Sequence, residues 1–449
     1  MSSQETTKEL FDFEYRQYDW DGSRMNHPNM KEDGFFRNRK PRRFKILPFD
    51  FTARGQRHWT HEMIRILLDL FFHFHEKRII WEELEIQVIS LNETFSRLLL
   101  HAVNTMNIFK KIDLSFLTCD IASEEHNDFC PGITSNKFIE ELKINCVGRM
   151  SRQHCHALNT LLQTNTPCLQ ELNLQTNVIN WILPGLRNNR TLKKVTLEFI
   201  ILDYEGDHGV TDALSCEMVA AVTRIPSLES LCFKLVGNVN YGGNLTSEAF
   251  RRLLSESNSL RELEIYSADP EPTFNTECFI QGLKNSRSLK RFFCRNALYG
   301  DLIFARLFRI LPDCPSLETL ELSFGILTVE DFVQVKLFPR LPRPIILKVH
   351  KRRFEVDDGG VFAELLRYHP EVRLSYDSDW IDLFEDCEWH AVALNWHGRY
   401  LLDRPNVPLC IWSLVLEKVN RNERLDEKGK VSIIYELLKG PACGGRISF

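Results

Sequence analysis

The chain has 449 residues, of which 43% are hydrophobic and 26% are charged, so it can bury a large core. Its net charge of -5 at pH 7 is small for this length, and no global field marks a nucleic acid or a membrane as the partner. The first residues have no apolar run, and no stretch reaches the roughly eighteen apolar residues of a membrane span. We therefore expect neither a secretory signal nor a spanning helix.

Residues 1–50 are polar and lack hydrophobic periodicity, so we expect a disordered N-terminal arm. Within this arm, RNRKPRRFK at 37–45 carries six basic residues. The run is either a nuclear-localisation or nucleic-acid-contacting segment or a solvated linker. We accordingly expect a cytoplasmic location, with the nucleus as the alternative if the run is a targeting signal.

Residues 51–80 are predicted to form an N-terminal cap. The apolar pattern favours a helix over 58–78, capped by Thr60, a residue type typical of helix N-caps. Such a helix would cover the first strand of the region after residue 80, as the ends of repeat proteins require.

From residue 81 to 375 a frame of the form L-x-x-L-x-L recurs at intervals of about 30 residues. Its last two apolar positions alternate with polar ones, which is the period of a short strand with one buried face. About ten copies occur, and they begin at Trp81, Phe109, Ile139, Leu169, Leu192, Leu228, Leu260, Leu289, Leu317 and the degenerate Pro344. The stretch HPEVRLS at 369–375 would add one more strand.

The copy LQELNLQTNVI, which begins at Leu169, also has Asn177 where a leucine-rich repeat prefers Asn or Cys. The sequence thus resembles the leucine-rich repeat family, closest to its ribonuclease-inhibitor-like intracellular class. The resemblance implies an α/β solenoid over 81–375, with a curved parallel sheet and outer helices. Connecting segments that begin at Thr246, Thr276 and Thr328, each followed by an acidic residue, are predicted to be helices with these threonines as N-caps.

Polar positions between the leucines change sign from one copy to the next, as Lys110 and Glu140 do. Neighbouring strands lie about 4.8 Å apart, so such charges would pair across the sheet and fix its register. This structural interpretation is favoured over a binding role for most of the concave face. The exception is a group of residue types typical of interface hot spots, expected to project from that face: Tyr266, Arg291, Phe293 and Arg295.

Three insertions follow the strands, at 203–212, 237–244 and 266–275. Loops of adjacent repeats lie on one rim of a solenoid, so these are either a rim that binds a basic protein segment or tolerated insertions. The residues of the predicted rim are Asp203, Tyr204, Glu205, Asp207, Tyr241, Tyr266, Asp269 and Glu271.

No motif for catalysis, a cofactor or a metal is found. His154, Cys155 and His156 are consecutive, and on the helix expected there they point about 100° apart, so they cannot converge on one ion. The 13 cysteines are odd in number and form no C-x-x-C pair, which indicates reduced core thiols, Cys278 and Cys294 among them.

After residue 375 the frame stops, and 376–449 is predicted to form a helical C-terminal cap. Four of the eight tryptophans lie there. The segment LNWHGRYLL, followed by VPLCIWSLVLEKVNR, resembles a C-terminal segment of uncharacterised algal repeat proteins, a resemblance that implies no activity.

The sequence therefore predicts a non-catalytic, intracellular scaffold that binds another protein. Two alternatives stay open. One is a substrate receptor of a ubiquitin ligase, with ILPFDF at 46–51 as a hint of a helical adaptor module. The other is a regulator of a small GTPase, for which no residue stands out.

Overall fold

The computed structural model describes the repeats and parts of the two ends of the chain. The described residues are 43–46, 50–51, 57–58, 71–72, 74–76, 78, 80–88, 108–116, 138–146, 152–175, 182–200, 212–236, 243–267, 274–295, 297–299, 302–324, 334–335, 338–351, 365–366, 368–375, 409–421 and 426–439. They fall into two compact units, residues 1–240 and 241–449.

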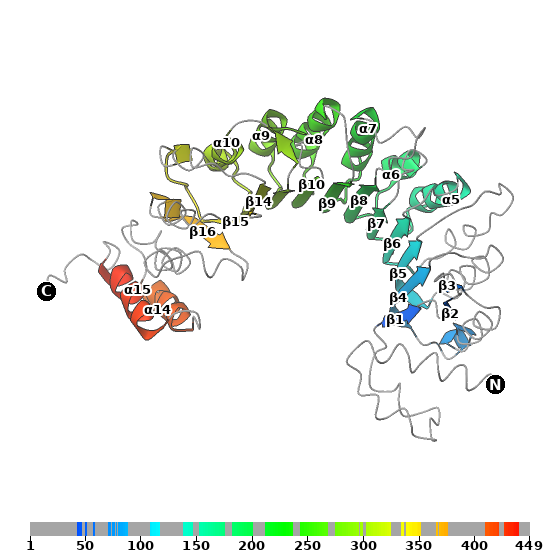
Figure 1. Ribbon diagram of the computed structural model, residues 1–449, viewed down its shortest axis with the longest axis horizontal. Coiled ribbons are helices and arrows are strands. Elements are labelled where there is room, and N and C mark those ends of the chain that lie inside the picture. Colours follow the sequence, from blue (N-terminus) through cyan, green and yellow to red (C-terminus); the bar gives the residue numbers. More distant parts are fainter. Residues whose placement is uncertain are drawn as a thin grey trace, which may run out of the picture. The chain divides into compact units, whose positions relative to one another are not determined.

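The first unit contains a parallel sheet whose strands follow chain order, and its labelled helices lie over one face of this sheet (Figure 1). The strands are β1 (Arg43–Ile46), β4 (Trp81–Val88), β5 (Phe109–Phe116), β6 (Glu141–Cys146), β7 (Glu171–Gln175), β8 (Lys194–Ile200) and β9 (Ser230–Val236). The helices are α5 (Arg152–Gln163), α6 (Leu183–Asn188) and α7 (Asp212–Thr223).

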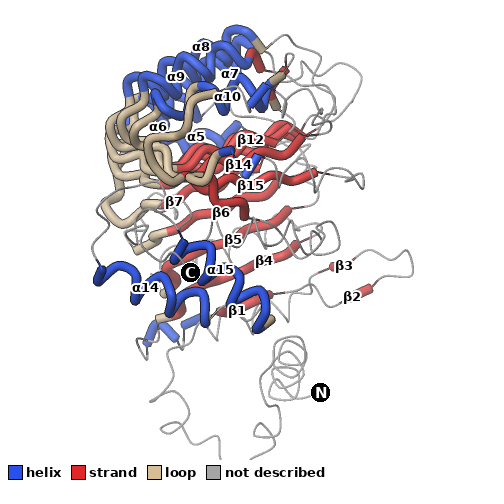
Figure 2. The backbone as a smooth tube through the Cα atoms, turned by 90° about the vertical axis from the view of Figure 1, so that its left-hand side faces the viewer, coloured by secondary structure: helices blue, strands red, loops and turns tan. Residues whose placement is uncertain are grey.

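The second unit repeats this plan, again with parallel strands in chain order and with helices over one face (Figures 1 and 2). Its sheet consists of β10 (Glu262–Ser267), β12 (Arg291–Arg295), β14 (Thr319–Phe324), β15 (Ile345–Lys351) and β16 (Val372–Ser375). The elements over it are α8 (Asn244–Glu256), α9 (Thr276–Asn285), α10 (Ile303–Arg309) and the 3-10 helix η3 (Leu311–Asp313). Two short strands, β11 (Phe274–Asn275) and β13 (Leu298–Tyr299), pair in parallel beside them.

The strand register confirms the predicted α/β leucine-rich repeat solenoid. Equivalent frame positions lie opposite each other, as Leu172 does to Val195 and Phe292 does to Leu320. Because strand side chains alternate between faces, one face of each strand enters the core. The fourth and sixth frame residues are at most 2% exposed: Ile112, Leu142, Ile144, Leu172, Leu174, Val195, Leu197, Leu231, Phe233, Leu263, Ile265, Phe292, Cys294, Leu320 and Leu322.

Polar side chains also tie successive repeats together, just before each frame begins. The buried Asn189 donates from Nδ2 to the carbonyl of Leu162 at 2.9 Å and accepts from the backbone N–H of Leu192 at 2.9 Å. Three serines immediately before a frame donate to carbonyls of the preceding repeat. These bonds run from Ser227 Oγ to Leu192 O (2.7 Å), from Ser288 Oγ to Ser257 O (3.0 Å) and from Ser316 Oγ to Ser286 O (3.4 Å).

Two helices begin earlier than the sequence predicts. Helix α8 has Gly243 as its N-cap, in the left-handed region with φ of 55°, and Thr246 lies inside the helix with its side chain buried. Helix α9 is capped by Asn275, whose side chain accepts from the N–H of Glu277 at 2.9 Å, and Thr276 is the first helical residue. Asn is a stronger N-cap than Thr, so the shift at α9 has a direct physical reason. Most of the helix predicted from Thr328 lies outside the described residues.

The N-terminal segment differs from the expectation in two places. The predicted arm without regular structure contains β1, which pairs in parallel with β4 so that Phe44 is opposite Leu84. The basic run at 37–45 therefore ends within this strand. Strand β2 (Asp50–Phe51) pairs antiparallel with β3 (Arg57–His58), so His58 does not begin the predicted helix, although 71–72 and 74–76 are helical.

At the other end, β16 continues the sheet beyond β15, so the frame at Pro344 is next to last. The pairing is offset from the frame by two residues: Leu347 is opposite Leu374 rather than Val372. Beyond it, α14 (Leu409–Asn420) and α15 (Glu427–Lys439) are helical, and their predicted role as a C-terminal cap stays a prediction. No helix in the described residues is both long and apolar enough to cross a membrane.

Candidate functional site

The open face of each sheet, defined here as the face opposite the helices, carries the third, fifth and seventh frame residues. In the first unit these register positions hold as many acidic as basic residues. The acids are Glu83, Glu85, Asp113, Glu141, Glu171 and Glu198, and the bases are Arg43, Lys45, Lys111, Lys143, Lys194 and Lys234.

Many of these charges pair across neighbouring strands, as the sequence predicts. The ion pairs on the open face are Lys111–Glu141 at 2.8 Å, Lys143–Asp113 at 2.6 Å, Lys194–Glu171 at 3.2 Å and Lys234–Glu198 at 3.9 Å. The second frame position contributes Lys110–Glu140 at 2.8 Å and, in the second unit, Lys290–Glu318 at 2.9 Å. The first unit thus uses its open-face charges mainly to hold register.

The open face of the second unit distributes its charges unevenly among its strands. Strand β10 supplies two acids, Glu262 and Glu264, whereas β12, β14, β15 and β16 together supply one acid and four bases. The acid is Glu321, and the bases are Arg291, Arg295, Lys348 and Arg373. Strands β12 to β16 therefore carry an excess of positive charge on the open face.

Glu321 is nearly buried at the centre of this group. Its side chain is 11% exposed, and Oε2 accepts from Arg291 at 2.8 Å and lies 3.5 Å from Lys348 Nζ. The hydrogen bond to Glu321 raises the pKa of Arg291, with further contributions from Glu262 and Glu264. One carboxylate thus bridges two strands and satisfies two cations.

Arg295 lies outside this ion-pair cluster. Its guanidinium carbon is 5.0 Å from the centre of the Tyr266 ring on the neighbouring strand, a cation–π geometry. Within the described part of the chain, no carboxylate forms an ion pair with Arg295. Arg295 is exposed, while Tyr266 and Phe293 are half-buried. We name the surface of Tyr266, Phe293 and Arg295 the Tyr–Phe–Arg cluster.

A rigid aromatic core supports this cluster from below. Phe292 and Cys294 alternate with Phe293 and Arg295 on β12 and are at most 1% exposed. Phe292 stacks on Phe279 of α9 with ring centroids 6.0 Å apart. Because alternate residues of a strand point to opposite faces, burial of these two residues fixes where the cluster's β12 residues point.

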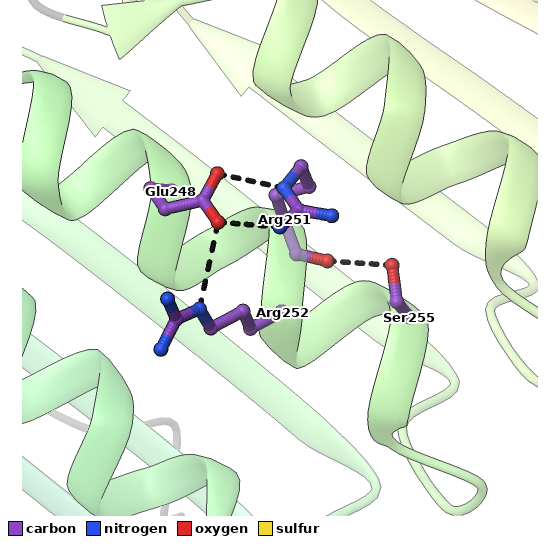
Figure 3. A network of polar contacts seen from close by, with 4 residues as sticks. All are labelled: Glu248, Arg251, Arg252 and Ser255. Atoms are coloured by element: carbon purple, nitrogen blue, oxygen red, sulfur yellow. Dashed lines mark hydrogen bonds and ion pairs between the residues drawn. The ribbon is translucent and has the colours of Figure 1, made fainter.

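The outer helices carry arginines too, but with carboxylate partners. On α8, Glu248 lies between Arg251 and Arg252 (Figure 3), bonded to Arg251 Nε at 2.6 Å and to Arg252 Nε at 3.5 Å. The hydrogen bond to Arg251 lowers the pKa of Glu248. Ser255 Oγ donates to the carbonyl of Arg251 at 2.8 Å within the same helix. Arg252 is thus an exposed arginine away from the open face and serves as a matched control for Arg295.

The structure brings four of the predicted site residues onto two neighbouring strands, Tyr266 on β10 and Arg291, Phe293 and Arg295 on β12. The two aromatic residues are half-buried on this face. The other predicted rim residues lie outside the described residues, so the rim stays a prediction: Asp203, Tyr204, Glu205, Asp207, Tyr241, Asp269 and Glu271.

Sequence reasoning missed two of the bases on the open face of β12 to β16, namely Lys348 on β15 and Arg373 on β16. Both lie in the degenerate copies that begin with Pro344 and His369, where the frame gave only a weak signal. The fifth frame position would have placed Lys348 beside Glu321, as the structure does.

The described residues offer no metal site and no disulfide. No group of three or more His, Cys, Asp or Glu side chains in the described ranges could hold an ion. Cys155 is buried in α5 while the next residue, His156, is exposed, as expected from their helical spacing. Burial raises the pKa of the Cys294 thiol to about 12, which keeps it protonated and unreactive at neutral pH.

Comparisons with known proteins give structural matches alone. No family model and no curated protein matches the chain. The yeast Rad7–Elc1 complex gives a chain with a TM-score of 0.36 and 14% identity, covering 72% of this chain and 85% of that one. The TLR13–ssRNA13 complex gives 0.36 and 16%, covering 70% and 44%. A protein of Bacteroides fragilis gives 0.29 and 14%, covering 75% and 89%. Scores this low carry no argument, and the fold assignment rests on the strand register above.

Proposed function

We propose that the chain is a non-catalytic module of the leucine-rich repeat type that binds another protein through the Tyr–Phe–Arg cluster. The observation that carries this proposal is Arg295, which makes a cation–π contact with Tyr266 beside Phe293, on an open face where Arg291 and Lys348 instead pair with Glu321. Tyrosine and arginine are enriched at interface hot spots, which lie on well-supported, preorganised surfaces.

The ribonuclease-inhibitor-like class is part of the same proposal. Both units alternate strands with α-helices, such as β7, α6 and β8 in the first and β10, α9 and β12 in the second. An intracellular location is also proposed, and it is supported by seven cysteines of the described residues that form no disulfide: Cys155, Cys168, Cys216, Cys232, Cys278, Cys294 and Cys314.

Proximity labelling in native cells, followed by quantitative pull-down of the labelled partner, tests the proposal. The variants are Phe293→Ala combined with Arg295→Ala, and Arg252→Gln as the control on the opposite face. A hot spot of at least about 2 kcal/mol corresponds to a loss of affinity of about thirtyfold.

The double variant should lose the partner at an unchanged melting temperature, because both side chains lie on the open face and outside the core. The control should keep it. Equal capture by all three proteins would contradict the proposal and direct attention to the acidic rim, where Asp203→Lys with Glu205→Lys is the corresponding variant.

A further inference from the structure

The second unit also indicates the chemistry of the segment that would bind it. Across β12 to β16 the open face presents four bases and one acid, and that acid is occupied by Arg291 and Lys348. Four bases and one acid leave β12 to β16 with three formal positive charges, against the two acids of the neighbouring strand β10. Complementary potentials steer partners together and select among them.

Arg295 is a cation without a described carboxylate partner. A guanidinium carries five N–H donors in its plane, and stacking on a ring uses its face rather than its edge. The guanidinium carbon of Arg295 lies 5.0 Å from the centre of the Tyr266 ring, and no described carboxylate forms an ion pair with Arg295. This arrangement suits a planar carboxylate that accepts two parallel N–H bonds.

We propose, resting on the protein-binding function above, that the partner is an acidic peptide segment whose Asp or Glu binds Arg295 while a neighbouring apolar side chain packs on Phe293. Residues two apart in a strand are separated by about 6.6 Å. An extended partner would therefore carry its acidic and apolar residues two positions apart.

A nucleic acid would also bind to basic side chains and aromatic rings, but the acidic residues of β10 disfavour it as the ligand. Glu262 lies opposite Arg291 and Glu264 lies opposite Phe293, so a continuous phosphate backbone across these strands would meet two negative charges. A peptide that carries a single acidic group avoids them. The site thus fits a short acidic and apolar motif better than a polyanion.

The experiment selects ligands directly from random sequences, so the identity of the cellular partner is not required. A displayed library of random peptides of about twelve residues, which span about 40 Å when extended, is panned on the full-length chain. The enriched peptides are synthesised, and their affinities are measured by fluorescence anisotropy. The proteins compared are wild type, Arg295→Gln, Phe293→Ala and the control Arg252→Gln. A labelled oligouridine is measured in parallel.

The expected peptides contain Asp or Glu two residues from an apolar side chain. Changing that acid to its amide should weaken binding to wild type by about tenfold, with little further loss on Arg295→Gln, whereas Arg252→Gln should match wild type. Peptides that lack an acid yet lose binding on Phe293→Ala would overturn this inference and leave the proposed function intact.

Three other results count against the proposal. Peptides indifferent to both Phe293→Ala and Arg295→Gln would overturn the proposed function itself. Oligouridine that binds wild type and is released by Arg295→Gln would replace the peptide with a nucleic acid. A library from which nothing is enriched above a no-protein control would also contradict an available peptide site.

Discussion

The two units solve the same packing problem and then use their open faces differently. In the first unit acids and bases alternate, so that Asp113 pairs with Lys143 and Glu171 pairs with Lys194. In the second unit β10 carries two acids, β12 to β16 carry four bases and one acid, and Arg295 contacts a ring instead of a carboxylate. The buried faces do not show this difference, because apolar residues occupy the fourth and sixth frame positions in both units.

The difference shows that a charged open face is not in itself a binding surface. A charge that already has a partner contributes register and a few tenths of a kcal/mol, and a ligand would have to replace that partner. The difference between the two units therefore points to a binding site where a charged side chain has no ion-pair partner within the sheet. Variants at matched positions of the two units test this difference.

The largest expected effect comes from the carboxylate that bridges two cations. Glu321→Gln keeps the side-chain shape but removes the charge that holds Arg291 and Lys348, so we expect a loss of about 2 kcal/mol in the free energy of unfolding. Glu171→Gln, whose ion pair with Lys194 is 39% and 55% exposed, should cost less than about 0.5 kcal/mol. Urea unfolding monitored by circular dichroism measures both. Equal losses would show that the two faces are energetically alike.

The outer helices should show a second contrast, at two equivalent glycines that each precede a frame start by the same distance. A Cβ at Gly185 of α6 would lie 2.8 Å from the backbone oxygen of Asn159, whereas a Cβ at Gly282 of α9 would first meet the flexible Leu254 side chain at 2.8 Å. Overpacking costs about 1–3 kcal/mol, and alanine recovers up to about 1 kcal/mol of helix propensity.

Gly185→Ala should therefore lower the free energy of unfolding by about 1 kcal/mol, and Gly282→Ala by clearly less, because a side chain can move away and a backbone oxygen cannot. Thermal unfolding of both variants beside wild type decides the order. If Gly282→Ala were instead the more destabilising variant, helix α6 would adjust to the added methyl group more easily than the close approach of Gly185 to Asn159 indicates.

How far the sequence predicts this molecule depends on how regular each copy of the frame is. Regular copies placed strands, buried leucines and ion pairs such as Lys111–Glu141 correctly. Irregular copies were predicted poorly. Strand β1, which lies just after Pro41, was not predicted at all, and β16 pairs with β15 two residues away from the predicted register. The stacking of Arg295 on Tyr266 is a choice of side-chain conformation, which depends on neighbouring strands and which a linear pattern does not specify.

The end of the second unit offers a pH-dependent contrast with the first. His369 stands where the frame has leucine, it is 1% exposed, and its Nε2 lies 2.9 Å from the carbonyl oxygen of Val335. Burial lowers the pKa of His369; the hydrogen bond with Val335 opposes this, and the charge of Arg340 adds to it. Since the folded pKa lies below the unfolded value of about 6.5, its contribution to stability is present above that pH and is lost on acidification.

Stability should therefore fall as the pH is lowered from about 7 toward 5, and His369→Leu, which restores the frame residue, should flatten this fall. Chemical unfolding at several pH values measures the slope for both proteins. An unchanged slope in His369→Leu would assign the acid sensitivity to other groups.

The smallest expected effect tests the register interpretation of the first unit most directly. On its open face Glu141 is opposite Glu171, which is opposite Lys194, so one like-charge pair interrupts the alternation. Exchanging the last two, Glu171→Lys with Lys194→Glu, would make all three alternate, and the next position along, Ser230, is neutral. Pairs of this kind are worth a few tenths of a kcal/mol, so the exchanged protein should be more stable than wild type by that amount at low salt. The gain should shrink at high salt, because exposed charges are screened.

Either single variant provides the control. Glu171→Lys places a positive charge opposite Glu141 but also opposite Lys194, and Lys194→Glu places a negative charge opposite Glu171. A double variant less stable than wild type would show that these charges respond to something other than their strand neighbours.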